Sequence, residues 1–140
     1  ESLGVRMERH CANALKVAQW LSADPRISWV SFPGLEEDKY HALAEKYMPN
    51  GTCGVISFGV PGGREKVSAF LDHLKMVSIA THVADARSCT LYPAGTTHRQ
   101  LTEEQLVEAG VGIDLVRLSC GIENADDIIT DLDQALAAVQ

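Results

Sequence analysis

The sequence predicts an α/β fold of the α+β type, in which helices pack on a mostly antiparallel sheet of about four strands. Stretches near both chain ends have apolar residues at the spacing of an amphipathic helix, and short apolar runs between them end in Pro/Gly turns. The chain has 140 residues, of which 46 % are hydrophobic and 22 % charged, an ordinary balance for a globular protein. We therefore expect a single domain over residues 1–140.

The first half of the chain predicts two helices and two strands. The N-terminal helix should end near Ser22, because Pro25 disfavours helical angles at the residue before it. The runs 27–34 and 53–60 are predicted strands, and the acid-rich segment between them predicts a helix over 35–48. The residues expected to face inward are Met7, Cys11, Ala14, Leu15, Ala18 and Leu21 on the first helix and Tyr40, Leu43, Ala44 and Tyr47 on the second.

The second half of the chain predicts three more helices and two more extended stretches. It predicts a helix over 64–75, an extended and kinked or split stretch over 83–95, a short helix over 102–108 and a strand over 114–121. A closing helix should begin after Asn124, a typical N-cap residue. The short helix has its own start signal, a capping box formed by Thr102 and Gln105. The pattern leaves a ferredoxin-like sandwich open as an alternative.

Charge and cysteine spacing exclude several classes of function. The net charge of −7 argues against nucleic acid or an anionic membrane as a partner, and no apolar run is long enough to span a bilayer. Neither the cysteines nor the histidines show the spacing of metal ligands, so no metal is expected. We interpret Cys11, Cys53, Cys89 and Cys120 as small buried residues of a reducing compartment, which predicts a cytoplasmic location.

Arg117 is the residue that carries most information about function. It lies in the apolar strand "DLVRLSCG", and its guanidinium cannot lose its proton, so burial there would demand an anionic partner. One interpretation is an internal salt bridge to Asp85, Asp114 or Glu123. The other is a bidentate clamp for a carboxylate or phosphate on a ligand. The residues alone support an α/β domain with a candidate anion-binding arginine.

The remaining motifs point to structure rather than to chemistry. The glycines of "GVPGGREK" precede a predicted helix, but the stretch lacks the spacing of a phosphate-binding loop, so we interpret it as a strand-to-helix turn. His10 and His73 lie on predicted helices, where partly exposed polar roles are usual. His82 and His98 lie in or beside the third extended stretch, where a histidine is more often a structural hydrogen-bonding group than a catalyst.

Several stretches of the chain, taken in order, resemble the C-terminal domain of the Cys/Met-metabolism enzymes that depend on pyridoxal phosphate. They are "RMERHCANALKVAQWL", "WVSFPGL", "HALAEKY", "ISFGVPGG", "HVADARSCTLYPAGTTHRQLTEEQLVEAGV" and "DLVRLSCGIENADDIITDLDQALA". The resemblance covers essentially the whole chain and is greatest for the O-acetylhomoserine sulfhydrylase branch. It implies the small C-terminal, substrate-clamping domain of a fold-type-I transferase, with the N-terminal cofactor-binding domain absent from this chain.

The resemblance also implies a substrate-binding site. Arg117 corresponds to the arginine of the family's "RLSxGxE" motif, which binds the substrate α-carboxylate, and Thr97 corresponds to a threonine that lines the same pocket. His82 stands where many relatives have Ser or Asn and could donate a hydrogen bond to the carboxylate. Ala84 replaces the usual Gly, a second departure from the family pattern. No residue of this chain is predicted to be catalytic.

Pyridoxal phosphate is implied as the cofactor of the parent enzyme only. No "S-x-T-K" stretch is present, so the Schiff-base lysine is not in this chain, which we expect to be inactive alone. The implied parent is a homotetramer that makes homocysteine or methionine from O-acetylhomoserine and sulfide or a thiol. Methionine γ-lyase and cystathionine γ-synthase are alternatives within the family. Outside it, the alternative is a free-standing anion-binding or regulatory domain with Arg117 as its site.

Overall fold

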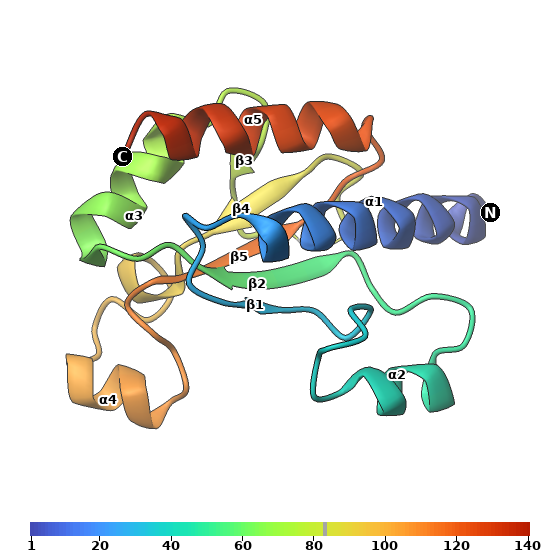
Figure 1. Cartoon of the computed structure of the whole chain (residues 1–140), viewed down its shortest axis with the longest axis horizontal. Helices are drawn as coiled ribbons and strands as arrows, with labels where there is room; N and C mark the ends of the chain where they lie inside the picture. The colour runs from blue at the N-terminus through green and yellow to red at the C-terminus, as the bar shows by residue number, and fades with distance from the viewer. Residues whose placement is uncertain (83) are drawn as a thin grey trace.

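The computed structural model, which describes residues 1–82 and 84–140, is built around one five-stranded sheet (Figure 1). The strand order is β1-β2-β5-β4-β3, and every neighbouring pair is antiparallel except the parallel pair β3–β4. The strands are β1 (Val30–Ser31), β2 (Val55–Gly59), β3 (Ser78–Ile79), β4 (Cys89–Leu91) and β5 (Leu115–Ser119). The mostly antiparallel sheet is confirmed, with one short strand more than the sequence predicts.

Three of the helices cover one face of this sheet. α1 packs on α5, β1 and β2, and α3 packs on α5. α2 and α4 lie on the other side, near opposite ends of the sheet (Figure 1). The helices are α1 (Leu3–Ala23), α2 (His41–Tyr47), α3 (Gly63–Asp72), α4 (Glu103–Glu108) and α5 (Ala125–Ala137), with a 3-10 turn η1 (Pro93–Gly95) between β4 and α4.

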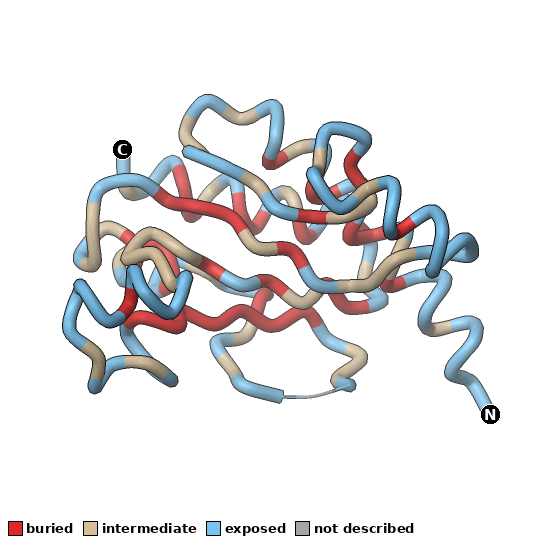
Figure 2. The backbone as a smooth tube through the Cα atoms, turned by 90° about the horizontal axis from the view of Figure 1, so that it is seen from below, coloured by how far each residue is buried: buried red, intermediate tan, exposed pale blue. Residues whose placement is uncertain are grey.

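The hydrophobic core lies between the sheet and these three helices. Burial alternates along β5, where Val116 and Leu118 are buried and Arg117 between them is exposed. On β2 the buried side chain of Phe58 meets Phe70 of α3 edge to face, with ring centroids 6.3 Å apart. Figure 2 shows the buried residues concentrated along the strands in the middle of the molecule. One sheet face is therefore core, and the opposite face is where Arg117 lies.

The local start and turn signals of the sequence are confirmed. Thr102 and Gln105 form a capping box at α4, and the side chain of Asn124 accepts a hydrogen bond from a backbone N–H at the start of α5. Gly62 and Gly63 precede and begin α3 with φ of 119° and 82°, a left-handed conformation that favours glycine. The "GVPGG" segment is therefore the turn that its glycines predict.

The prediction for residues 35–48 needs correction. Only His41–Tyr47 form a helix, and consecutive turns precede it. The carboxylate of Asp38 accepts hydrogen bonds from the backbone N–H groups of Phe32 and Tyr40, so the acid that would begin a longer helix stabilises turns instead. Of the four side chains expected to face inward, only Ala44 is buried, whereas Tyr40, Leu43 and Tyr47 are more than half exposed.

The third extended stretch is split. The strand β4 lies within the predicted range 83–95, and η1 follows it. Val83, the first residue of that range, lies outside the described residues. His10 also differs from expectation: it is buried, and its Nδ1 donates to the carbonyl oxygen of Cys120 at 2.6 Å, which ties α1 to the end of β5.

Candidate functional site

Arg117 occupies the centre of the sheet on the face away from the core. It lies opposite Ser57 of β2 on one side and Leu91 of β4 on the other. The sequence places it among apolar strand residues, but strand alternation directs its neighbours Val116 and Leu118 to the core and leaves Arg117 exposed. Because the guanidinium of Arg117 stays exposed, it does not lose its hydration, and no internal anion is needed to offset such a loss.

The three acidic residues considered as internal partners of Arg117 are engaged elsewhere. Asp85 forms an ion pair with Arg87 at 3.2 Å and accepts its backbone N–H at 3.0 Å. Asp114 accepts hydrogen bonds from a serine hydroxyl and a tryptophan indole N–H near β1. Glu123 accepts the backbone N–H and the hydroxyl of one serine. Within the described residues, then, the Arg117 guanidinium has no acidic partner, and the internal salt bridge is not observed.

Arg117 lines a small hollow on the open face of the sheet. The hollow has a volume of about 240 Å³, and His82 and Ser119 also contribute to its wall. Its full lining is Val55, Ala80, His82, Ala84, Cys89, Thr90, Leu91, Arg117 and Ser119. A planar cation, an imidazole and a hydroxyl at one hollow form a set that a small carboxylate can satisfy.

Two features of the hollow's wall affect its chemistry. Burial raises the pKa of the Cys89 thiol, and the negative charge of Asp85 acts in the same direction, while the charge of Arg117 opposes them. Cys89 is thus a neutral thiol near pH 7 and not a nucleophile. Ala84 has a φ of 61°, a left-handed conformation in which alanine is strained. A glycine, which the family resemblance implies at this position, would adopt it without a Cβ clash.

Thr97 lies apart from the hollow. It is exposed, and its Oγ1 is 2.8 Å from Nδ1 of the adjacent His98. It is not among the nine described residues that line the hollow. The structure therefore brings Arg117 and His82 to one place and leaves Thr97 outside it.

The described residues do not fit a cofactor-attachment site for pyridoxal phosphate. None of those lining the hollow is a lysine. The chain's five lysines lie elsewhere: Lys16 pairs with Asp126 at 2.7 Å, Lys39 and Lys46 each lie over a tyrosine ring, Lys66 is on α3 and Lys75 follows α3. Among the residues described, there is also no cluster of three or more His, Cys, Asp or Glu placed to hold a metal ion.

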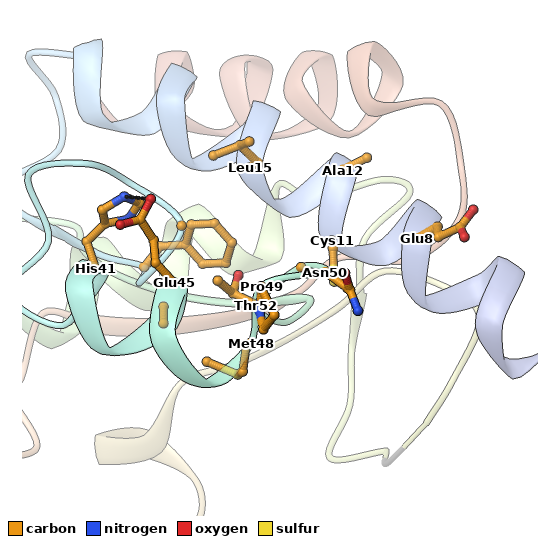
Figure 3. Close-up of a pocket in the computed structure, with 14 residues that line it drawn as sticks. Glu8, Cys11, Ala12, Leu15, His41, Glu45, Met48, Pro49, Asn50 and Thr52 are labelled. Atoms are coloured by element: carbon orange, nitrogen blue, oxygen red, sulfur yellow. Dashed lines mark ion pairs between the residues drawn. The ribbon is translucent and has the colours of Figure 1, made fainter.

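A larger hollow of about 530 Å³ lies between α1 and α2 (Figure 3). Its wall is mostly apolar, with Leu15 on one side and Met48 on the other. Its imidazole is already engaged, because His41 Nδ1 lies 2.9 Å from the Pro33 carbonyl oxygen and Nε2 lies 3.6 Å from Glu45. The half-buried thiol of Cys11 also lines this hollow, and burial raises the pKa of that thiol, which disfavours the reactive thiolate.

The sequence did not single out Ser88 or assign a role to Glu123 in supporting the site. Ser88 is fully buried beside the hollow and contacts Glu123 through both its backbone N–H and its hydroxyl. The residues are 35 positions apart, so no local pattern links them. The sequence signal that could have found this contact is the Gly-x-Glu after the strand predicted over 114–121, because a glycine there permits another backbone to approach closely.

Comparison with known proteins places these features in context. Residues 1–137 match the family model described as "Cys/Met metabolism PLP-dependent enzyme". The chain is 48 % identical over 137 residues to the O-acetyl-L-homoserine sulfhydrylase of Leptospira meyeri, covering 97 % of this chain and 31 % of that protein. It is 47 % identical over 136 residues to the homocysteine synthase of Schizosaccharomyces pombe, covering 97 % of this chain and 32 % of that protein.

A solved structure has the same fold. It is a crystal structure from Campylobacter jejuni, described as an O-acetylhomoserine (thiol)-lyase and containing N'-pyridoxyl-lysine-5'-monophosphate. The TM-score is 0.89 at 40 % identity, covering 97 % of this chain and 32 % of that one. This chain thus spans about a third of the length of the relatives it matches. Within the described residues, none of the helices combines the length and hydropathy needed to cross a membrane.

Proposed function

Because this chain belongs to the Cys/Met metabolism PLP-dependent enzyme family, we propose that it is the C-terminal, substrate-clamping part of an O-acetylhomoserine sulfhydrylase. The parent enzyme would exchange the acetyl ester oxygen of O-acetylhomoserine for the sulfur of sulfide or a thiol. Acetate leaves, and the product is homocysteine or methionine. The names of relatives at 47–48 % identity support this reaction over the others of the family.

The observation that carries the proposal is the state of Arg117. Its guanidinium is exposed at a hollow of about 240 Å³, and the acids considered as internal partners bind other groups. A free, planar cation at a concave surface is suited to a bidentate contact with the α-carboxylate of an amino acid. In our proposal Arg117 fixes the carboxylate, and His82 donates a hydrogen bond to one of its oxygens.

Thr97 completes the proposed site only if the segment between η1 and α4 shifts toward the hollow. Its hydroxyl now contacts His98, and a shift would also have to break backbone hydrogen bonds of this exposed segment, such as the one from His98 to the Pro93 carbonyl oxygen. We propose that Thr97 lines the pocket in the parent enzyme, where the rest of the chain forms the opposite wall. This placement is an expectation from the family motif and has its own test: Thr97→Ala should raise the KM for the amino-acid substrate less than Arg117→Ala does.

The cofactor would be held by the rest of the parent enzyme, since the described residues of this chain provide no site for its attachment. Pyridoxal phosphate supplies the electron sink in enzymes of this family, and the protein supplies binding and orientation. The part that falls to this chain is to hold the substrate by its carboxylate, so that the remainder of the molecule is presented in one orientation.

A product assay on the full-length protein tests the proposal. The enzyme is supplied with O-acetylhomoserine plus sulfide, and in a parallel reaction with methionine alone. Sulfur-dependent formation of homocysteine and acetate is the expected result. Release of methanethiol from methionine at a comparable rate would assign the chain to a γ-lyase instead, and the absence of both reactions with retained anion binding would favour a binding domain.

A further inference from the structure

The hollow's wall at Ala84–Cys89 is held against the end of β5 by a closed set of hydrogen bonds. Glu123 Oε1 accepts the backbone N–H of Ser88 at 2.6 Å, and Oε2 accepts the Ser88 hydroxyl at 3.0 Å. The same hydroxyl oxygen accepts the backbone N–H of Gly121 at 2.8 Å. Every donor and acceptor in this set is used, and Ser88 is fully buried.

This contact lies directly beyond the β4–β5 ladder. The last pair of the ladder is Cys89 with Ser119, and both residues line the hollow beside Arg117. Beyond the ends of β4 and β5, the hydrogen bonds between Ser88 and the Glu123 carboxylate connect the two segments. Hydrogen bonds to a carboxylate are stronger than those between neutral groups, so this connection is firm although it involves only two side chains, those of Glu123 and Ser88.

Gly121 shows how closely the two segments approach. A Cβ built on it would lie 2.5 Å from the carbonyl oxygen of Ala86 and closer still to the backbone nitrogen of Ser88. The backbone N–H of Ile122 also donates to Ala86 at 2.9 Å. The glycine and the glutamate of the "CGIE" sequence therefore act together: one permits the approach, and the other fixes it.

The other end of the same loop is held from α1. Arg6 Nη2 donates to the carbonyl oxygen of Ala84 at 2.8 Å, and Arg6 lies 3.5 Å from Nε2 of His10. His10 in turn donates to the carbonyl oxygen of Cys120, the residue that follows β5. The loop 84–88, whose residue Ala84 has strained backbone angles, is thus fixed at both ends relative to the strand that carries Arg117.

From this geometry we propose that Glu123 is a positioning residue for the substrate carboxylate. It does not contact the hollow itself. It holds the Ala84–Cys89 wall at a fixed separation from Arg117, so that a carboxylate meets both sides at once. This inference rests on the proposed function of Arg117 and goes beyond it, because it assigns a role to a residue outside the binding surface.

The test uses the full-length enzyme, four single variants (Glu123→Ala, Glu123→Gln, Ser88→Ala and Arg117→Ala) and the double variant Glu123→Ala/Arg117→Ala. Asp127→Asn is the matched control, because Asp127 is an exposed acid in the first turn of α5, close to Glu123 in the chain. Two readouts are taken: amide hydrogen exchange of the peptide that contains residues 84–88, and the KM values for O-acetylhomoserine and for sulfide.

We expect Glu123→Ala to speed exchange in this peptide and to raise the KM for O-acetylhomoserine about 10-fold, with the KM for sulfide unchanged. Glu123→Gln keeps one carbonyl acceptor and should recover part of the loss. Ser88→Ala loses only the hydroxyl and should give a smaller effect, which keeps the test usable if Glu123→Ala does not fold. In the Arg117→Ala background, loss of Glu123 should raise the KM by less than it does in the wild type.

Two results would overturn the inference. In the first, amide hydrogens of the 84–88 peptide exchange in Glu123→Ala and Glu123→Gln at the same rate as in the Asp127→Asn control. The other is faster exchange with an unchanged KM for O-acetylhomoserine, while Arg117→Ala raises that KM. If Arg117→Ala itself leaves the KM unchanged, the proposed carboxylate site fails, and the exchange measurement alone then decides whether Glu123 holds the loop.

Discussion

Ser57 on β2 and Arg117 on β5 are cross-strand partners at the centre of the sheet. Each lies between two buried neighbours on its strand, so both side chains lie on the face away from the core, where Ser57 is half-buried and Arg117 is exposed. A short hydroxyl side chain beside the arginine leaves room above the sheet, and the hollow that Arg117 lines occupies the adjoining surface toward β4. The small neighbour thus helps to keep the guanidinium accessible to a ligand.

Gly121→Ala should destabilise the domain. The added Cβ would collide with the backbone of residues 86 and 88, and backbone atoms cannot move aside as a flexible side chain can. We expect the free energy of unfolding to fall by at least about 2 kcal/mol, measured by urea unfolding of the 140-residue chain. Gly4→Ala is the control, because nothing lies within 4 Å of its Cβ position in α1, and it should be neutral or slightly stabilising. Equal stability of the two variants would contradict the described approach of the loop to β5.

Ala84→Gly should not destabilise the protein, unlike most substitutions to glycine. Relief of the left-handed strain at φ 61° offsets the greater freedom of glycine in the unfolded chain, and we expect a gain of about 0–1 kcal/mol. Ala86→Gly, at a nearby position without a positive φ, should lose about 0.5–1 kcal/mol. Thermal unfolding of both variants checks the difference, and a larger loss at Ala84 than at Ala86 would count against the strained conformation.

The buried carboxylate of Asp131 should make stability depend on pH. Burial acts to raise its pKa, but hydrogen bonds from the backbone N–H groups of Val77, Lys75 and Met76 and from Gln134 lower it overall. A lowered pKa in the folded state means that its stabilisation is complete above the unfolded value of about 4 and is lost as the pH falls through the folded value.

Asp131→Asn provides the measurement. At pH 7 the variant should be less stable than the wild type by about 1–3 kcal/mol, because one charged acceptor for the 75–77 turn is lost. The difference should shrink as the pH falls below about 4, since the wild-type carboxylate then becomes protonated. Denaturant unfolding of both proteins from pH 7 to pH 2.5 tests this, and a difference independent of pH would refute the assigned role.

The sequence predicts well those features that depend on neighbouring residues. The Thr102–Gln105 capping box, the Asn124 cap and the turn at Gly62–Gly63 are each formed within a few residues, and all are confirmed. The closing helix predicted after Asn124 is likewise present as α5, and it buries Ile128 and Leu132. These local signals place the starts of α4 and α5 and the turn before α3.

Features that depend on distant partners were not predictable. Tyr40 and Tyr47 have the spacing of an inward-facing stripe, yet they are exposed in this chain, and periodicity cannot show whether a covering surface is present. The strand β3 is two residues long and leaves no alternation to detect, whereas β1 lies within the predicted run 27–34 but spans only two of its residues. The Glu123–Ser88 contact joins segments 35 residues apart, and only the folded chain brings them together.

The candidate site was partly predictable. The two interpretations of Arg117, internal salt bridge or ligand clamp, were both stated from the sequence, but choosing between them required knowing that Asp85, Asp114 and Glu123 bind other groups. The family resemblance also named His82 for the carboxylate site, and the fold brings it to the hollow of Arg117 although 35 residues separate the two along the chain. Thr97, by contrast, is named by the same family resemblance, but the structure leaves it outside the hollow.

The central claim is that Arg117 binds the substrate carboxylate, and kcat/KM for O-acetylhomoserine in the full-length Arg117→Ala enzyme tests it most directly. Loss of a bidentate, charge-assisted contact should cost about 2–4 kcal/mol, which is about 30- to 1000-fold in kcat/KM. Arg117→Lys should recover little of this, because an ammonium cannot form the planar fork. Arg9→Ala, an exposed arginine on α1, is the matched control, and the melting temperatures of all three variants should stay close to that of the wild type. A kcat/KM for Arg117→Ala equal to that of Arg9→Ala would contradict the account.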